Sequence, residues 1–529
     1  MHLKSIHKKL DCEKNVLYNK CYYIKEIIDK GADGIIYNGI YDKKKCVIKK
    51  MKYDYNIDIS PVIIRELIIL NNISHNNLIN AIDVFSNINN GEINIIMKNK
   101  GETLLNFLLN NELTDDDKNL IILQLLNAIN GLHENNYIHG DISLKNILVK
   151  KEGAKLKVTL IDFSTTTKHN RYYKSKMLPT SYICPYELLN TEFLTNTKNP
   201  KSSDIFSLGC IIYFVITKKP LFEGLDEKSQ YMDISNKLLY NKSQLFFEIK
   251  EHYMYKIIRT MIQLNPTKRP DIRTIINDNM VKNKMKIYGL INFANEIDKE
   301  IDKELNKIKP ANIDSHSLSM KMNKNRYNID INLKVILAET ILNYKENIIS
   351  YETIFLTLNN LSKLKKHDYV TGIILFWLSV NIIENMIIPA QNIREMIIQR
   401  YPKFNLSNEE LIKKKYKLIQ KLNYDIDEST IYQIIFALGI NERKKIIRDS
   451  LILMIFTDRT YLSNYDIYEL LQSHLNNNIK ENLNKKYDVI KKNIYMGNLQ
   501  KLNDYNEKKY NYKDLNIFNL FNKIDKIFK

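Results

Sequence analysis

Five polar side chains in the first third of the sequence are of the types that phosphoryl transfer needs. Lys49 can neutralise phosphate oxygens, and Glu66 can pair with that lysine and hold it extended. Asp141 can accept the proton of an attacking hydroxyl, whereas Asn146 and Asp162 offer the hard oxygen atoms that Mg²⁺ prefers. Single pairs of this kind occur by chance, but an ordered set of five seldom does. The set therefore predicts transfer of a phosphoryl group from a magnesium-bound triphosphate.

A short glycine turn precedes these residues. The run GADG, from Gly31 to Gly34, stands between two apolar runs, so its backbone can lie close over a triphosphate where a side chain would obstruct. Taken alone, the turn is more typical of an ordinary β-hairpin. Its place ahead of Lys49 favours a phosphate-binding role.

The elements expected to position these side chains fall into two groups. Short runs rich in Ile, Val and Tyr predict strands at residues 22–28, 35–41, 46–51 and 92–97. One helix is expected among them, with Ser60 as N-cap and Pro61 at its first position. From residue 104 to about residue 279 the periodicity is mainly helical, with a helix start at Thr114. A small strand-rich part is thus expected ahead of a larger helical one.

Composition argues against several classes of protein. Of the 529 residues, 44% are hydrophobic and 26% are charged, which supplies enough apolar surface for packed cores and argues against wholesale disorder. The net charge of +19 is compatible with a nucleic-acid partner. Lysines spread along the whole chain are more typical of solvated surfaces, however, so nucleic acid is not the favoured partner.

Cysteine usage and hydropathy predict an intracellular protein, in the cytoplasm or nucleus, without a membrane span. The five cysteines show no C-x-x-C spacing for zinc or for a redox pair. The N-terminal residues lack the apolar run of a signal peptide. The most hydrophobic stretch, residues 370–388, contains Ser379, Asn381 and Glu384, and its unbroken apolar part is too short to cross a bilayer. A buried helix is expected there.

The ordered set resembles the signature of the eukaryotic protein kinase family. The runs HGDISLKN (139–146) and IDFS (161–164) are similar to its H-R-D-x-x-x-x-N and D-F-G motifs, and the likeness covers about residues 20–280. The helix sequence IIREL, followed by SHNNLINAIDVF, looks most like the cyclin-dependent branch. The resemblance implies an α+β two-lobed protein kinase fold that binds ATP and Mg²⁺ between its lobes and phosphorylates protein hydroxyls.

By this resemblance the candidate site is assigned residue by residue. Asp141, Lys145 and Lys49 would be catalytic, and Lys145 is expected to meet the transferring phosphate. Asn146 and Asp162 would hold the metal. The residues expected at the nucleotide are Ile28, Gly31, Gly34, Ile36, Lys49, Glu66, Met97, Asn146 and Asp162.

Two further likenesses concern the segment after the D-F-G-like motif. Glu187, in a PYE triplet where the family has A-P-E, is expected to pair with Arg269 of the run NPTKRP. Thr180, seven residues before Glu187, is similar to the Thr of serine/threonine kinases and favours that specificity. The segment also resembles a peptide-binding loop, which favours a protein substrate over a small molecule.

Several positions depart from the family pattern, among them Ser143, which stands where many members have a lysine. Asp29 stands where the family has its first loop glycine, and Ser164 stands where it has the glycine of D-F-G, but neither change removes a metal ligand. Gly140 replaces an arginine that in the family grips a phosphorylated activation loop. We therefore expect protein contacts to position the helix that bears Glu66. We also expect little effect of phosphorylation at Thr165 to Thr167, Tyr172, Tyr173 or Ser175.

The second half of the chain resembles a cyclin box. Residues 350–364 and 405–435 are similar to two of its helices, with Leu422 to Asp425 at the end of the second. The Lys and Glu that contact the kinase in that family align near Val380 and at Lys415, so the usual electrostatic link is expected to be missing. The resemblance implies a cyclin-like domain that activates the kinase in cis. Without it, the region would be interpreted as a generic helical bundle.

These interpretations give five expected segments and two competing functions. The segments are an N-terminal extension (1–20), a kinase domain (21–282, with lobes 21–99 and 100–282), a helix and linker (283–330), an all-α cyclin-like domain (331–480) and a basic helical tail (481–529). The favoured function is a serine/threonine protein kinase regulated in cis. The alternative is a pseudokinase scaffold, with Asp29, Ser143 and Ser164 as marks of decay and a helical half that binds a partner.

Overall fold

The structure is a computed structural model of the chain. The residues that it describes are 13–15, 20–31, 34–54, 57–87, 90–153, 155–168, 185, 187, 200–223, 227–240, 242–290, 327–344, 349–426 and 454–455. Several segments named above lie outside this part of the chain: the expected helix beyond residue 290, the linker up to residue 326, and the tail at 481–529.

The chain divides into two compact units. One contains Met1–Lys52 and Arg65–Ala311, and the other contains Tyr53–Ile64 and Asn312–Lys529. A short segment from the first half of the sequence therefore belongs to the second unit. The division falls inside helix α1 (Pro61–Asn72).

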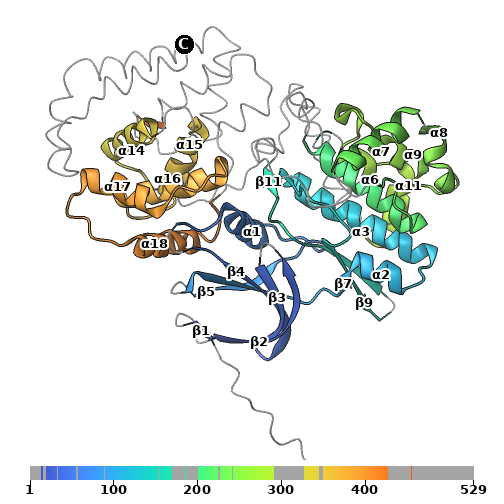
Figure 1. The fold of residues 1–529 in the computed structure, drawn as a ribbon, viewed down its shortest axis with the longest axis horizontal. Coiled ribbons are helices and arrows are strands. Elements are labelled where there is room, and N and C mark those ends of the chain that lie inside the picture. Colours follow the sequence, from blue (N-terminus) through green and yellow to red (C-terminus); the bar gives the residue numbers. More distant parts are fainter. Residues whose placement is uncertain are drawn as a thin grey trace, which may run out of the picture. The chain divides into compact units, whose positions relative to one another are not determined.

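The first unit begins with a six-stranded antiparallel sheet, drawn in blue in Figure 1. β-Branched residues suit the pleated surface, and Ile48, Ile93 and Ile95 are fully buried in its core. All four strands expected from the sequence are present. In spatial order the strands are β1 (Glu13–Asn15), β2 (Lys20–Gly31), β3 (Gly34–Tyr41), β4 (Lys44–Lys52), β6 (Glu92–Met97) and β5 (Ala81–Asn87).

Helices dominate the rest of the first unit, as the sequence predicts. Helix α3 begins where expected: the Thr114 hydroxyl accepts the Asp117 N–H, and the Asp117 carboxylate accepts the Thr114 N–H. The helices are α2 (Leu104–Asn110), α3 (Asp115–Glu134), α6 (Ser202–Thr217), α7 (Glu227–Tyr240), α8 (Lys242–Leu245), α9 (Tyr255–Met261), α10 (Ile272–Ile276) and α11 (Asn279–Ile287). The short strands are β7 (Glu102–Thr103), β8 (Tyr137–Ile138), β9 (Ile147–Glu152), β10 (Lys155–Leu160) and β11 (Thr167–Lys168).

The described part of the second unit contains five long helices. Helix α16 is apolar on all sides and buried, which confirms the helix expected within residues 370–388. Gly372 lets α16 pack closely, because a Cβ at this position would lie 2.5 Å from Cδ1 of Leu337. The helices are α14 (Ile331–Asn343), α15 (Tyr351–Ser362), α16 (Tyr369–Ile383), α17 (Ala390–Arg400) and α18 (Asn408–Lys421).

Helix α18 begins with a capping box formed by Ser407 and Glu410. The absence of the usual electrostatic link of the cyclin family stays a prediction, because it concerns a likeness of the sequence. Lys415 has a different partner within this unit: its ammonium lies 2.6 Å from the Asp58 carboxylate. That carboxylate comes from the segment Tyr53–Ile64, which belongs to the same unit.

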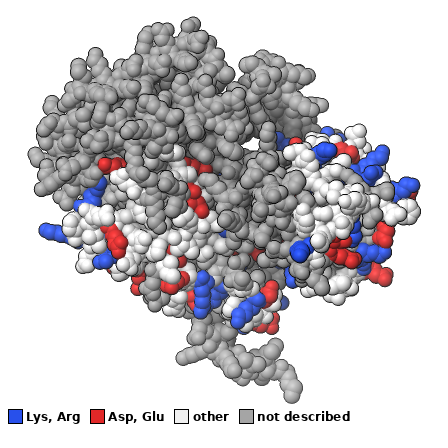
Figure 2. Space-filling view, turned by 45° about the horizontal axis from the view of Figure 1, so that its top comes forward, with Lys and Arg blue, Asp and Glu red and all other residues white. Residues whose placement is uncertain are grey.

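The described residues bear on two expectations from the composition, the absence of a membrane span and the spread of lysines over the surface. Among the described residues, no helix is both long and apolar enough to cross a bilayer. On the face drawn in Figure 2, basic and acidic side chains are interspersed over the described surface. The excess of lysine is therefore not gathered into one basic patch on this face.

Candidate active site

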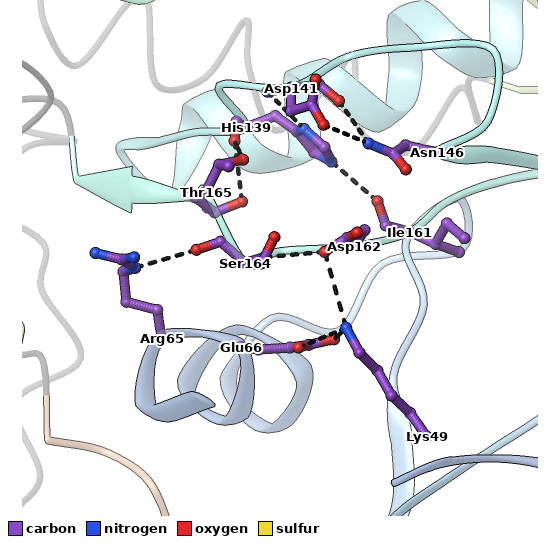
Figure 3. A network of polar contacts seen from close by, with 11 residues as sticks. Lys49, Arg65, Glu66, His139, Asp141, Asn146, Ile161, Asp162, Ser164 and Thr165 are labelled. Atoms are coloured by element: carbon purple, nitrogen blue, oxygen red, sulfur yellow. Dashed lines mark hydrogen bonds and ion pairs between the residues drawn. The ribbon is translucent and has the colours of Figure 1, made fainter. Parts of the chain in front are cut away.

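A buried ion pair joins the sheet to helix α1 in the first unit. Lys49 lies on β4, and its Nζ donates to both carboxylate oxygens of Glu66, at 2.7 and 2.8 Å. Glu66 lies on α1, whose start is capped by Ser60 through its hydroxyl and the Val62 N–H. Figure 3 shows the lysine side chain extended toward the carboxylate. The structure thus brings together the first two residues of the predicted set.

Asp162 approaches the same lysine from the loop after β10. Its Oδ1 lies 3.9 Å from Nζ of Lys49 and accepts the N–H of Ser164 at 3.2 Å. Its backbone has a φ of 65°, which is uncommon for a residue other than glycine. Burial acts to raise the pKa of this carboxyl, but the ammonium of Lys49 and the hydrogen bonds from Ser164 outweigh it, so the pKa lies below its ordinary value. The carboxylate is therefore charged and suited to a cation.

Asp141 and Asn146 form the opposite side of the network in Figure 3. The Asn146 amide nitrogen donates to the Asp141 carbonyl oxygen at 2.9 Å and to its Oδ2 at 3.0 Å. These two bonds orient the amide and direct its oxygen away from Asp141. One carboxylate that can accept a proton is thereby fixed beside one amide oxygen that can bind a metal.

His139 and Asp204 hold the loop that carries Asp141. Nδ1 of His139 accepts the Asp141 N–H at 3.2 Å, and its Nε2 donates to the Ile161 carbonyl at 3.0 Å. Asp204 accepts the N–H groups of His139 and Gly140 at 2.9 and 3.0 Å. Both nitrogen atoms of the buried imidazole are used in structural bonds. These bonds make His139 a structural residue that holds the loop, and leave neither ring nitrogen to act as a general base.

Asp204 is a charged anchor inside the protein. It is 2% exposed and lies 2.9 Å from Nε2 of His133. Burial acts to raise its pKa, but the hydrogen bonds from His133 and the backbone N–H of Gly140 hold the pKa below its ordinary value. The sequence gives no sign of this role, because the partners of Asp204 lie 64 or more residues away in the chain.

The glycine turn joins β2 to β3, and residues 32–33 lie outside the described part. Gly34 must be glycine here: its φ is +144°, and a Cβ would meet the Lys50 carbonyl oxygen at 2.5 Å. A Cβ at Gly31 would point into open space, so that position carries no such constraint. Of the apolar residues expected at the nucleotide, Ile28 is 49% exposed, Ile36 is half-buried and Met97 is buried.

The remaining predicted residues are distributed as follows. Lys145 is exposed, in the loop between Asp141 and Asn146. Arg269 and Glu187 form the expected pair with two parallel contacts, Nη1 to Oε1 at 2.6 Å and Nη2 to Oε2 at 2.8 Å. Thr180 lies outside the described residues, as do Tyr172, Tyr173 and Ser175.

Arg65 is a residue of this network to which the sequence analysis gave no role. It precedes Glu66 on α1, is 6% exposed, and donates from Nε to the Ser164 carbonyl at 3.3 Å. The hydroxyls of Thr165 and Thr166 donate to the His139 carbonyl at 2.9 and 3.3 Å. A buried arginine in an otherwise apolar helix was the available signal, since such a side chain needs a fixed partner.

Comparison with known proteins agrees with this geometry. Residues 22–281 match the family described as "Protein kinase domain". All predicted site residues named above lie within this matched segment. Similar proteins include the probable serine/threonine-protein kinase fhkB of Dictyostelium discoideum, 28% identical over 273 residues that cover 50% of this chain and 23% of that protein. Mitogen-activated protein kinase 2 of Pneumocystis carinii is 26% identical over 259 residues, which cover 47% of this chain and 72% of that protein.

A viral protein shows a likeness of similar extent. The putative serine/threonine-protein kinase L673 of Acanthamoeba polyphaga mimivirus is 28% identical over 303 residues, covering 51% of each chain. The chain therefore spans about a quarter of the first relative and about half of this one. Protein kinase domains in general use ATP as substrate and Mg²⁺ as cofactor.

The donor atoms of the site fit such a metal. Mg²⁺ takes oxygen ligands, and Asp162 offers a carboxylate whose pKa lies below its ordinary value. Asn146 offers an amide oxygen whose orientation is set by the two bonds of its nitrogen to Asp141. These two residues would hold the metal.

Proposed function

We propose that this protein is a serine/threonine protein kinase that transfers the γ-phosphoryl group of ATP to protein hydroxyls. The observation that carries the proposal is the convergence of five side chains from β4, α1 and two loops. The Lys49–Glu66 pair is closed at 2.7 Å, and Asp162 lies 3.9 Å from the same lysine. Such a closed pair beside an ionised aspartate is the arrangement that phosphoryl transfer requires of this fold.

The chain's own residues divide the chemical work. Lys49, held by Glu66, binds phosphate oxygens of ATP and keeps them in one orientation. The Asp141 carboxylate accepts the proton of the substrate hydroxyl as the hydroxyl oxygen attacks phosphorus. Lys145, exposed four residues after Asp141, neutralises charge on the transferring group. The leaving group is ADP.

Asn146 and Asp162 would bind Mg²⁺, which supplies positive charge to the phosphate oxygens when it is present. The proposed specificity for serine and threonine rests on two points. Several relatives carry the words "serine/threonine-protein kinase" in their names. Thr180 stands seven residues before Glu187, as in kinases of that specificity.

The helical part of the chain is proposed to regulate this activity in cis. We retain the kinase domain at 21–282 and the cyclin-like domain at 331–480 as proposals, together with the likeness to the cyclin-dependent branch. This proposal is supported by the residue ranges that make up the second unit. The unit includes Tyr53–Ile64 and hence the first turn of α1. The helix that carries Glu66 therefore begins in one unit and ends in the other.

The test compares the full chain with its Asp141→Asn variant. Each is incubated with Mg-ATP labelled at the γ-phosphorus and a generic protein substrate, and the modified residue type is mapped. We expect transfer to serine and threonine by the natural sequence and a loss of about 10³-fold or more in the variant. Equal signal from both proteins, or none from either, would support the scaffold alternative.

A further inference from the structure

A buried polar cluster in the second unit binds the segment that precedes α1. Nζ of Lys415 lies 2.6 Å from Oδ1 of Asp58, and both side chains are 0% exposed. Asn381 bridges the pair: its Nδ2 donates to Oδ2 of Asp58 at 3.0 Å, and its Oδ1 accepts from Lys415. The ammonium also lies 4.0 Å from the centroid of the Trp377 ring. Two helices, α16 and α18, thus converge on one carboxylate.

The backbone of the same segment is held as well. The Ala390 N–H donates to the Ile57 carbonyl at 2.8 Å. The Ile59 N–H donates to Oδ1 of Asp58 at 2.7 Å, and the Asp58 N–H donates to the Asp54 carbonyl at 3.1 Å. The main-chain and side-chain bonds together fix this short segment in a single placement against α16 and α18.

Stability alone does not account for a buried pair of this kind. Taking both charges out of water is costly, and an apolar pair of similar volume is often as stable or more so. Burial raises the pKa of Asp58 and lowers that of Lys415 to about 8, which reflects this cost. What the pair adds is specificity, because a displaced segment would leave a buried charge without its partner.

Asp58 lies close to the catalytic network along the chain. It stands two residues before Ser60, the cap of α1, and eight residues before Glu66. The rise along a helix is about 1.5 Å per residue, so Glu66 lies within two turns of the helix start. Because a helix of this length is stiff, a shift or rotation at its start moves the Glu66 carboxylate relative to Lys49.

We propose that Asp58 and Lys415 are positioning residues for phosphoryl transfer, and that their buried contact selects the placement of α1 at which Glu66 meets Lys49. The proposal rests on the proposed kinase function. In this view the helical unit recognises its own chain through one acidic side chain ahead of α1. Asn381 and Trp377 complete the receptor for that side chain.

The experiment uses four variants of the full chain: Lys415→Met, Asp58→Asn, the double variant, and Lys363→Met as a matched control. Lys363 pairs with Asp425 in the same unit, Nζ to Oδ2 at 3.1 Å. We measure kcat and KM for ATP and for the protein substrate, at a temperature below the first unfolding transition of each variant. Amide hydrogen exchange of residues 57–72 is measured in parallel.

We expect each single variant at the cluster to lower kcat by about 10- to 100-fold, with KM for the protein substrate within about twofold. Exchange at residues 57–72 should rise in these variants and not in Lys363→Met, which should keep kcat. The double variant should recover part of the loss, because neither charge is left buried alone. Asp58→Asn is nearly isosteric and keeps the test valid if Lys415→Met unfolds.

Unchanged exchange at residues 57–72, or an equal loss of kcat in Lys363→Met, would overturn the positioning role. These outcomes are distinct from failure of the proposed function. If the natural chain transfers no phosphate, the activity proposal fails, whereas the exchange measurement still decides whether the cluster places α1.

Discussion

Two buried lysine–carboxylate pairs involve residues that flank the start of α1 in the sequence, Asp58 before it and Glu66 after it, and the pairs differ in what surrounds the lysine. Lys49 contacts Glu66 and also approaches Asp162, the residue proposed to bind Mg²⁺. Lys415 is enclosed by Asp58, Asn381 and the Trp377 ring, and its side chain is 0% exposed. The neighbour of Lys49, Asp162, would bind and release Mg²⁺ during a reaction cycle. The partners of Lys415 all belong to the protein itself. By the two proposals above, the same chemical pair serves catalysis in one place and positions a helix in the other.

The largest effect is expected when the lysine of the proposed catalytic pair, Lys49–Glu66, is removed. Lys49→Met should lower kcat/KM for phosphoryl transfer by about 100-fold or more, because an electrostatic contact to the phosphates is lost. Thermal unfolding should also move to a lower temperature, because the Glu66 carboxylate is left buried without its cation, so the loss of activity is what distinguishes this pair from the other. Steady-state kinetics and calorimetry on the same samples measure both effects. A variant that lost stability and kept activity would reverse the assignment of the two pairs.

The corresponding change in the other pair should act on stability first. Lys415→Met leaves the Asp58 carboxylate buried without its cation, which typically costs about 3–5 kcal/mol. Urea unfolding, followed through the fluorescence of Trp377, the one tryptophan in the sequence, reports on this unit. The double variant with Asp58→Asn should recover much of that loss. No loss in the single variant would mean that the pair is not closed in solution.

Much of the catalytic pair was predictable, and the reasons are local. Lys49, Glu66, Asp141, Asn146 and Asp162 occur in short motifs whose order along the chain carries the information. The strands and the capped helices were also predicted, because periodicity and caps are properties of neighbouring residues. Strand β5 was missed, since its sequence, AIDVFSN, carries polar residues that suit its place at the edge of the sheet.

The pair at Asp58 could not be predicted in the same way, because its partners are 357 residues apart in sequence. One signal was nevertheless available. Lys415 falls on the apolar face of α18, at helical spacing with Leu411, Ile412 and Ile419, all of which are buried. A lysine at such a position requires a buried partner, although the sequence does not say which. The candidate site in the first half is thus signalled by short motifs, whereas the packing in the second half depends on residues far apart in the sequence.

The caps of the two helices that carry these pairs give a finer comparison. Ser407→Ala removes the cap of α18 and Ser60→Ala that of α1, and each should lower stability by about 1 kcal/mol. We expect Ser60→Ala also to lower kcat, because it loosens the helix that bears Glu66. Ser407→Ala should leave kcat within about twofold. Equal effects of the two changes on kcat would argue that helix position is not what limits transfer.

The smallest expected effect is the pH dependence of the free energy of unfolding, and Asp162 and Asp58 contribute to it with opposite signs. The pKa of Asp162 is lowered from 3.8 in the folded protein, so its contribution to the free energy of unfolding is present above pH 3.8 and is lost as the pH falls below that value. The pKa of Asp58 is raised by burial, so its contribution is present below pH 3.8 and is lost as the pH rises through the folded-state value.

Urea unfolding between about pH 2 and 6 tests these signs. The stability difference between the natural chain and Asp162→Asn should increase with pH, whereas the difference from Asp58→Asn should decrease. Parallel slopes would show that the two carboxyls sit in similar electrostatic surroundings, contrary to the comparison above.

The division of α1 between two compact units also bears on synthesis at the ribosome. Lys415 emerges 357 residues after Asp58, which at roughly 5–20 residues per second corresponds to a delay of about 20 to 70 s. During that interval the segment ahead of the helix has no receptor, and by the proposal above the nascent kinase domain would transfer phosphate at a reduced rate. Emergence of α18 from the ribosome would then be the event that raises this rate.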